Sequence, residues 1–290
     1  MTVTATRVAL PPQAARLLAG RFGSRAAWVA GGGLVLLLGA SVLMRVAAVG
    51  HPLTPSLADT LAAPSLGHPF GTDALGRDVF ARSIYAAVPD LQIAVIASGI
   101  PAVLGVLIAV LAGYRPGWAD AAVVRVVDFL LAFPLMVLVI CVVAIIGPGL
   151  TGVYLALVVK GLPGYIRLAR GQMLVLREQQ FVLAAETLAL PRRRILVGHC
   201  LPHVVRPILV YAIFDITGNI LLLASLSYLG LGVQPPGAEW GAIMADGQAY
   251  LLQAWWIVVL PGLVVVLVGV AISVLGEALA ERMRLGGAIQ

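Results

Sequence analysis

Six long apolar runs separated by polar segments dominate the pattern of this chain. A helix needs about 20 apolar residues to cross about 30 Å of hydrocarbon. The runs that meet or approach this length are residues 26–49, 91–113, 123–146, 151–168, 204–226 and 254–275. The fourth run is the weakest, because Lys160, Gly161 and Pro163 interrupt it. The pattern therefore predicts an all-α membrane protein with six transmembrane helices between residues 26 and 276.

The composition of the chain supports this prediction. Hydrophobic residues make up 61% of the sequence and charged residues only 11%, whereas a soluble domain has about 25% charged residues. A soluble protein is therefore excluded. The net charge of +6 would suit a nucleic-acid partner, but the positions of the charges indicate another cause.

The arginines are distributed unevenly between the two sides that six spans define. Arginine and lysine accumulate in the cytoplasmic loops of membrane proteins. Only Arg45, Arg77 and Arg82 fall on one side, and the other fifteen arginines fall on the opposite side. This predicts that the N-terminal tail (1–25), the loop 169–203 and the C-terminal tail (277–290) are cytoplasmic. Nucleic acid is then not an expected partner.

Two segments on the predicted outer side contain more than a simple connection needs. Asp73, Arg77 and Asp78 lie among glycines that allow tight turns, so these charges can pair locally. The alternatives are a folded outer cap held by ion pairs and a contact with a substrate-delivery protein. In the last outer loop, a broken apolar stretch around Trp240 predicts a short helix at the membrane interface, where tryptophan is enriched.

The loop 169–203 contains a basic, alanine-rich stretch that is predicted to form a short helix from Phe181 to Ala189. Pro191 is expected to end that helix. The small side chains of Ala184 and Ala185 would let a partner approach closely, so both are expected where the helix seats in a partner's groove. Composition alone leaves two interpretations open, a docking element and a solvated cytoplasmic hairpin.

Several strings resemble one known family in their order and spacing. They are GTDALGRDVFAR (71–82), RVVDFLLAFP (125–134) with GPGL (147–150), REQQFVLAA (177–185) with HCLP (199–202), and SLSYLGLGVQPPGAEWGAIMADG (225–247). The chain is similar to the C-type permease subunit of dipeptide, oligopeptide and nickel ABC importers. The similarity extends over about residues 67–276. It favours the docking interpretation of the loop 169–203, which resembles the EAA loop of these permeases.

The resemblance implies a type I importer permease fold in the bacterial inner membrane. The implied partners are a homologous B-type permease, two ABC ATPases, an extracytoplasmic substrate-binding protein and the lipid bilayer. ATP and Mg would be used by the ATPases, and this chain would bind no cofactor or metal. The implied ATPase-coupling residues are Phe181, Leu183, Ala184, Ala185, Glu186, Leu188, Ala189, Arg193, His199 and Pro202.

The sequence departs from the family pattern at three places. Ala189 stands where the family usually has glycine, so the turn after the coupling helix is expected to form differently, with the help of Pro191. Ala224 replaces a usual acidic residue, and residues 276–283 replace the usual C-terminal motif. The coupling geometry, the substrate and the C-terminal contacts are therefore not fixed by the resemblance.

Charged and polar residues inside the spans are candidate functional groups, because an isolated charge in hydrocarbon is costly. Asp128 is expected to pair with Arg125 or Arg167. Asp215 and Asn219 are predicted either to line the translocation pathway or to bind the partner permease, and Lys160 must find water, a carboxylate or backbone carbonyls. His199 and His203 have the spacing of a metal pair, but no further ligand completes a metal site.

The chain has no phosphate-binding loop of the G-x-x-x-x-G-K-[ST] type, so a non-catalytic subunit is predicted. The expected function is to form half of the translocation pathway of an ATP-driven peptide importer and to couple it to a separate ATPase. Alternative cargoes are nickel chelates, glutathione or another small solute. A different class, an autonomous ion-coupled carrier, would use Asp128, Lys160 and Asp215 as an intramembrane relay.

Overall fold

The computed structural model describes residues 12–47, 53–114, 117–234 and 237–287. The helices are α1 (Pro12–Ala47), α2 (Val79–Gly113), α3 (Trp118–Leu131), α4 (Leu135–Ile146), α5 (Leu150–Leu176), α6 (Gln180–Thr187), α7 (Arg192–Arg194), α8 (Leu201–Tyr228), α9 (Trp240–Asp246) and α10 (Trp256–Gly287). Leu57–Asp59 and Gln248–Tyr250 form 3₁₀ turns, and Ile195–Cys200 (η2) forms a π-helical turn. Within these ranges the only extended pairing is an isolated bridge between Thr72 and Asp78, so the predicted all-α class is confirmed.

In the part of the chain that the structure describes, five helices are long and apolar enough to cross a membrane, namely α1, α2, α5, the continuous run from α7 to α8, and α10. The remaining predicted span, the third in chain order (residues 123–146), is instead two helices, α3 and α4, with a bend of 96° between them. The cause is local: Pro134 has no N–H to continue a helix and disfavours helical geometry at the preceding residue, Phe133. Taken together the bent pair counts as the third of six spans, but the expectation that these residues form a single helix is wrong.

Several helices extend well beyond the predicted spans. α2 begins at Val79, twelve residues before the predicted start, because the Asp78 carboxylate caps it by accepting a hydrogen bond from Ala81 N at 2.7 Å. α1 begins at Pro12 and α10 continues to Gly287, so both predicted tails are partly helical. Hydropathy locates the apolar part of a helix, whereas caps and turn residues decide where the helix ends.

The interrupted fourth run, by contrast, forms one continuous helix. α5 contains Lys160, Gly161, Pro163 and Gly164 without a break. A Cβ atom on Gly161 would lie 2.9 Å from a Pro101 side-chain carbon, and one on Gly164 would lie 2.4 Å from the Tyr211 hydroxyl. The small residues therefore let α5 pack closely against α2 and α8, as in other membrane helix pairs.

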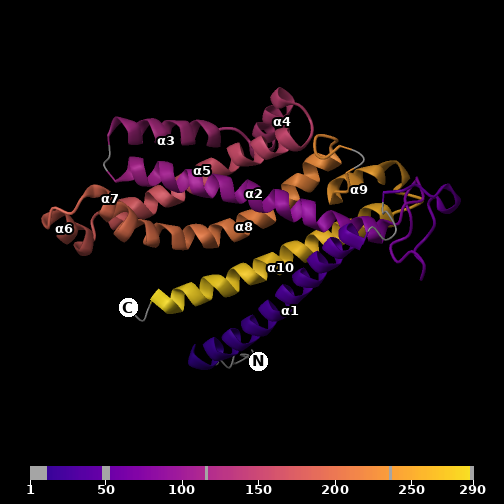
Figure 1. Ribbon diagram of the computed structural model, residues 1–290, viewed down its shortest axis with the longest axis horizontal. Coiled ribbons are helices and arrows are strands. Elements are labelled where there is room, and N and C mark those ends of the chain that lie inside the picture. The colour runs from indigo at the N-terminus through magenta and orange to yellow at the C-terminus, as the bar shows by residue number, and fades with distance from the viewer. Residues whose placement is uncertain (1–11, 48–52, 115–116, 235–236, 288–290) are drawn as a thin grey trace, which may run out of the picture.

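The helices form an elongated bundle with two distinct ends (Figure 1). α6 and α7 lie at one end, and α9 lies at the other end beside the segment 53–78. α2 is central and packs most extensively against α5 and α8, while α1 lies along α10 and α2. The two ends and the middle of the bundle therefore carry the three groups of candidate functional residues.

Candidate functional site

The loop between α5 and α8 forms a hairpin with α6 at the tip of the bundle (Figure 1). One face of α6 is buried: Val182 and Ala185 pack into a core with Tyr114, Ile195 and Cys200. The opposite face is exposed and largely apolar, and it comprises Phe181, Leu183, Ala184 and Leu188. We call these four residues the exposed α6 face. An exposed apolar face on a short helix is suited to docking against another protein.

The two neighbouring alanines of α6 lie on different faces of the helix. Ala184 belongs to the exposed α6 face, but Ala185 is only 5% exposed and contacts the core of its own chain. The expectation that both alanines seat in a partner's groove is therefore wrong for Ala185. Successive residues of a helix are about 100° apart, so two adjacent side chains on a short helix do not face one surface.

Glu186 connects α6 to the end of α2. The Tyr114 hydroxyl donates a hydrogen bond to Glu186 Oε1, and the Arg192 guanidinium lies over the Tyr114 ring at 4.9 Å from its centroid. Burial, followed by the hydrogen bond to Glu186, raises the pKa of Tyr114 to about 12. The phenol is therefore protonated and able to donate at neutral pH.

α6 ends in a left-handed turn at Ala189, before Pro191 is reached. The N–H of Leu190 bonds to the carbonyl of Ala185 at 3.1 Å and the N–H of Ala189 bonds to that of Glu186 at 2.9 Å, which is the Schellman pattern. Ala189 has φ +52°, a conformation that favours glycine. The expectation of a differently formed turn is therefore wrong: alanine adopts the conformation that glycine would adopt, at a cost of about 1 kcal/mol.

Replacing Ala189 with glycine is expected to stabilise the hairpin by up to about 1 kcal/mol, because glycine relieves the strain of the left-handed conformation. Glycine also raises the conformational entropy of the unfolded chain, which offsets only part of this gain. The matched control is Ala184→Gly, the same chemical change inside α6, which should destabilise the hairpin by roughly 0.5–1 kcal/mol. Hydrogen exchange of the Leu190 amide measures both. Faster exchange in the Ala189→Gly variant would contradict the prediction.

The remaining predicted coupling residues lie around α6 without forming a chemical centre. Arg193 and Pro202 are exposed and His199 is half-buried in η2. His203 stacks obliquely on Phe181 with 5.5 Å between ring centroids. In the part of the chain that the structure describes, no group of three or more His, Cys, Asp or Glu side chains could hold a metal ion.

A polar cluster joins α2, α5 and α8 inside the bundle. Lys160 Nζ donates to Asp215 Oδ1 at 2.8 Å and to Asn219 Oδ1 at 2.9 Å. Asn219 Nδ2 donates to Ser98 Oγ at 2.8 Å and to Asp215 Oδ2 at 3.1 Å, and the Tyr165 hydroxyl donates to Asp215 Oδ2 at 3.2 Å. We call these five residues the three-helix polar cluster. Its single positive and single negative charge are paired.

The three-helix polar cluster is largely closed, because the side chains of Lys160 and Asp215 are only 14% and 7% exposed. Of the three partners left open for Lys160, namely water, a carboxylate or backbone carbonyls, the structure shows a carboxylate, that of Asp215. Asp128 does not join the cluster. It pairs at 3.2 Å with Arg167, which is one of its two expected partners, on an exposed surface between α3 and α5. The relay of Asp128, Lys160 and Asp215 that a carrier would use is not assembled.

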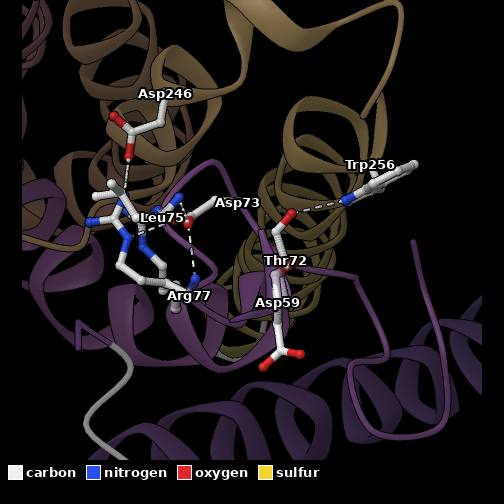
Figure 2. A network of polar contacts seen from close by, with 8 residues as sticks. Asp59, Thr72, Asp73, Leu75, Arg77, Asp246 and Trp256 are labelled. Carbon is white, nitrogen blue, oxygen red and sulfur yellow. Dashed lines mark hydrogen bonds and ion pairs between the residues drawn. The ribbon is translucent and has the colours of Figure 1, made fainter. Parts of the chain in front are cut away.

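The opposite end of the bundle is held by a charge network (Figure 2). Arg77 Nε contacts Asp73 Oδ2 at 2.7 Å, and Arg82 Nη1 bonds to the same carboxylate oxygen. Both arginines also reach Asp246 Oδ2 at 3.0 Å, at the end of α9. The predicted ion-paired cap therefore exists, and it joins the segment 53–78 and α2 to α9. Asp78 lies outside the Asp73 network, where it caps α2 and pairs with His68 at 2.7 Å.

Trp240 begins the predicted short helix, α9, but it is fully buried and does not lie at the bilayer interface as expected. Its backbone N–H donates to Asp90 Oδ2 at 2.9 Å and its indole N–H donates to the Ser83 carbonyl at 2.8 Å. Glu239 caps α9 by accepting from Gly241 N and Ala242 N, each at 2.9 Å. These contacts draw α9 onto α2 and remove Trp240 from the surface.

Sequence reasoning missed Arg82, Asp246, Tyr114 and Tyr165. Asp246 lies 164 positions from Arg82 along the chain, and Glu186 lies 72 positions from Tyr114. Local spacing holds no information about such pairs. A charge count gave no signal either, because Asp59, Asp73 and Asp78 already outnumber Arg77 and Arg82 in the first outer loop.

Comparisons with known proteins agree with this arrangement. Residues 105–285 match the family described as binding-protein-dependent transport system inner membrane component. The chain is 36% identical over 248 residues to the probable D,D-dipeptide transport system permease protein DdpC of Escherichia coli K12, covering 86% of this chain and 83% of that one. It is 40% identical over 220 residues to the glutathione transport system permease protein GsiD of Escherichia coli O6:K15:H31, covering 76% and 73%.

A solved structure shares the fold. The crystal structure of an amino acid ABC transporter with histidines matches with a TM-score of 0.56 at 14% identity, covering 70% of this chain and 94% of that one. Helices, hairpin and sequence together define a transport permease. The chain belongs to the family of binding-protein-dependent transport system inner membrane components, and it is a multi-pass protein of the bacterial inner membrane. Family members are inner membrane components of binding-protein-dependent transport systems, and the predicted importer permease fold and inner-membrane localisation are confirmed, while the cytoplasmic position of both termini stays a prediction.

Proposed function

We propose that this chain is one of two homologous permease subunits of an ATP-driven peptide importer, and that the exposed α6 face docks on a separate ABC ATPase. The observation that carries the proposal is the two-faced α6 helix, which is fixed to the bundle on one side and apolar and exposed on the other. The relative named for D,D-dipeptide transport supports a peptide cargo, and the relative named for glutathione transport supports glutathione as the alternative cargo.

The proposed orientation has α6 and both termini in the cytoplasm and α9 with the segment 53–78 outside. The excess of arginine in the segments on the α6 side supports this orientation through the positive-inside rule. In this arrangement the ATPases meet α6, and the substrate-binding protein meets the end that the Asp73, Arg77, Arg82 and Asp246 network holds. ATP and Mg bind to the ATPases, and the chain itself performs no catalysis.

Reconstitution tests the proposal. The chain, tagged and purified from its native membranes with its bound partners, is placed in proteoliposomes with the cognate binding protein. Uptake of labelled dipeptide is expected to need ATP, and the isolated chain is expected to show no ATP hydrolysis. Uptake driven by a proton or sodium gradient without ATP would overturn the proposal. Competition by longer peptides, glutathione and nickel chelates ranks the cargoes.

A further inference from the structure

Tyr114 lies at the junction between α2 and the coupling hairpin. It follows directly after Gly113, the last residue of α2, and its side chain is only 6% exposed. Its ring packs in the same core as Val182 and Ala185 from the buried face of α6. Tyr114 is therefore in contact with the hairpin through both its ring and its hydroxyl.

The hydrogen bond from Tyr114 to Glu186 is a specific link between the end of α2 and α6. Among the described residues, it is the one side-chain hydrogen bond that joins α6 to another helix. The Arg192 guanidinium lies over one face of the ring, so Tyr114 contacts Glu186 through its hydroxyl and Arg192 through its ring. Because Tyr114 is bonded to Glu186 and packed in the core that holds the buried face of α6, we expect a displacement of α6 to displace Tyr114 as well.

α2 leads from this junction into the middle of the bundle. A Cβ on Gly105 of α2 would lie 2.6 Å from Tyr165 of α5, so the two helices are in close contact. Further along α2, Ser98 accepts a hydrogen bond from Asn219 of the three-helix polar cluster. A movement of the α2 end is therefore transmitted by tight packing to α5 and α8, since packed helices do not deform continuously.

We propose that Tyr114 is a positioning residue for energy coupling: through its hydrogen bond to Glu186 it transmits displacement of α6 to α2, by a route additional to the covalent connections of the hairpin to α5 and α8. This inference rests on the proposed docking of an ATPase on α6. The bond is suited to the role because a hydrogen bond to a charged group shifts an equilibrium by about ten-fold or more.

The test is Tyr114→Phe, which removes only the hydroxyl, in the complete complex in proteoliposomes. Assembly and ATP hydrolysis should persist, while the number of ATP molecules hydrolysed per peptide imported should rise several-fold. Glu186→Gln keeps an acceptor oxygen but makes the hydrogen bond a weaker, neutral one, so its ratio should fall between those of the parent and of Glu186→Ala. Tyr154→Phe, which alters a half-buried tyrosine of α5 remote from the hairpin, is the matched control.

A double variant separates a shared route from independent effects. Tyr114→Phe combined with Glu186→Ala should be no worse than Glu186→Ala alone, because both changes break one link. The inference would be overturned if the effects of the two changes multiplied in the double variant, or if Tyr114→Phe alone left the ratio of ATP hydrolysed to peptide imported unchanged. If the parent complex shows no ATP-dependent uptake, the proposed function fails instead. Hydrogen exchange then still tests the link: α6 amides in the purified Tyr114→Phe chain should exchange faster, and equal rates would refute it.

Discussion

Replacing Asp215 with leucine is expected to abolish transport while leaving membrane insertion intact. The change leaves Lys160 charged, largely enclosed and without its carboxylate partner at the junction of α2, α5 and α8. Breaking a buried ion pair from one side costs about 3–5 kcal/mol, which is a large fraction of the stability of a typical domain. Insertion should be unaffected, because removing a charge from a span does not hinder entry into the bilayer. Uptake in proteoliposomes and recovery of the assembled complex measure the effect.

The double variant Lys160→Met/Asp215→Leu decides what the pair does. Replacing both charged partners with apolar side chains is often nearly neutral. If the pair only holds the three helices together, the double variant should therefore assemble normally and recover most of the uptake. A pair that binds cargo or carries a proton should remain inactive when both charges are absent. Full uptake by the Asp215→Leu single variant would show that the cluster is dispensable.

The second large effect is expected from Ala184→Arg on the exposed α6 face. Arginine there adds bulk and a charge that must lose water against the docked partner. Substitutions at such central contacts cost roughly 2 kcal/mol or more of binding free energy, which is about a 30-fold loss of affinity. The chain should still fold, because Ala184 does not contact its own core. Co-purification of the ATPase and ATP-dependent uptake should both be lost.

Two neighbouring substitutions serve as comparisons for Ala184→Arg. Ala185→Arg puts the same side chain into the buried face and should disrupt the hairpin itself, which accelerated hydrogen exchange of η2 and α6 would reveal. Arg193→Ala changes an exposed residue beyond α6 and should be milder. Unchanged ATPase binding and uptake in Ala184→Arg would place the docking surface elsewhere on the chain.

The sequence alone predicted most of the spans, because about 20 consecutive apolar residues have few alternatives to a membrane helix. It did not predict the break between α3 and α4, although Pro134 is visible in the sequence, because Pro163 and Pro101 lie inside continuous helices. Whether a proline breaks a span depends on how neighbouring helices compensate for the lost hydrogen bond. The hydropathy of the sequence contains no information about that compensation.

The hairpin was predicted as a whole, but the orientation of its side chains was not. Its position, its helix and its coupling residues follow from composition and from the family strings, but the direction of each α6 side chain depends on where the helix begins. That start was set by Gln179 and the turn after α5, so Ala185 faces inward and Ala184 outward. Likewise, Lys160 and Asp215 were separately recognisable as charges needing partners, and only the packing of α5 against α8 joined them.

The broken span also has a consequence for biosynthesis. α3 has 14 residues and α4 has 12, which correspond to about 21 Å and 18 Å of helix. Neither piece can cross about 30 Å of hydrocarbon alone, so neither can leave the translocon as an independently stable unit. We therefore expect the translocon to retain both pieces until α5 has emerged and offered Val153, Ala156 and Leu157 as a packing surface for α4. Insertion of this region is therefore coupled to tertiary folding, and the ribosome must synthesise α5 before the preceding span is complete.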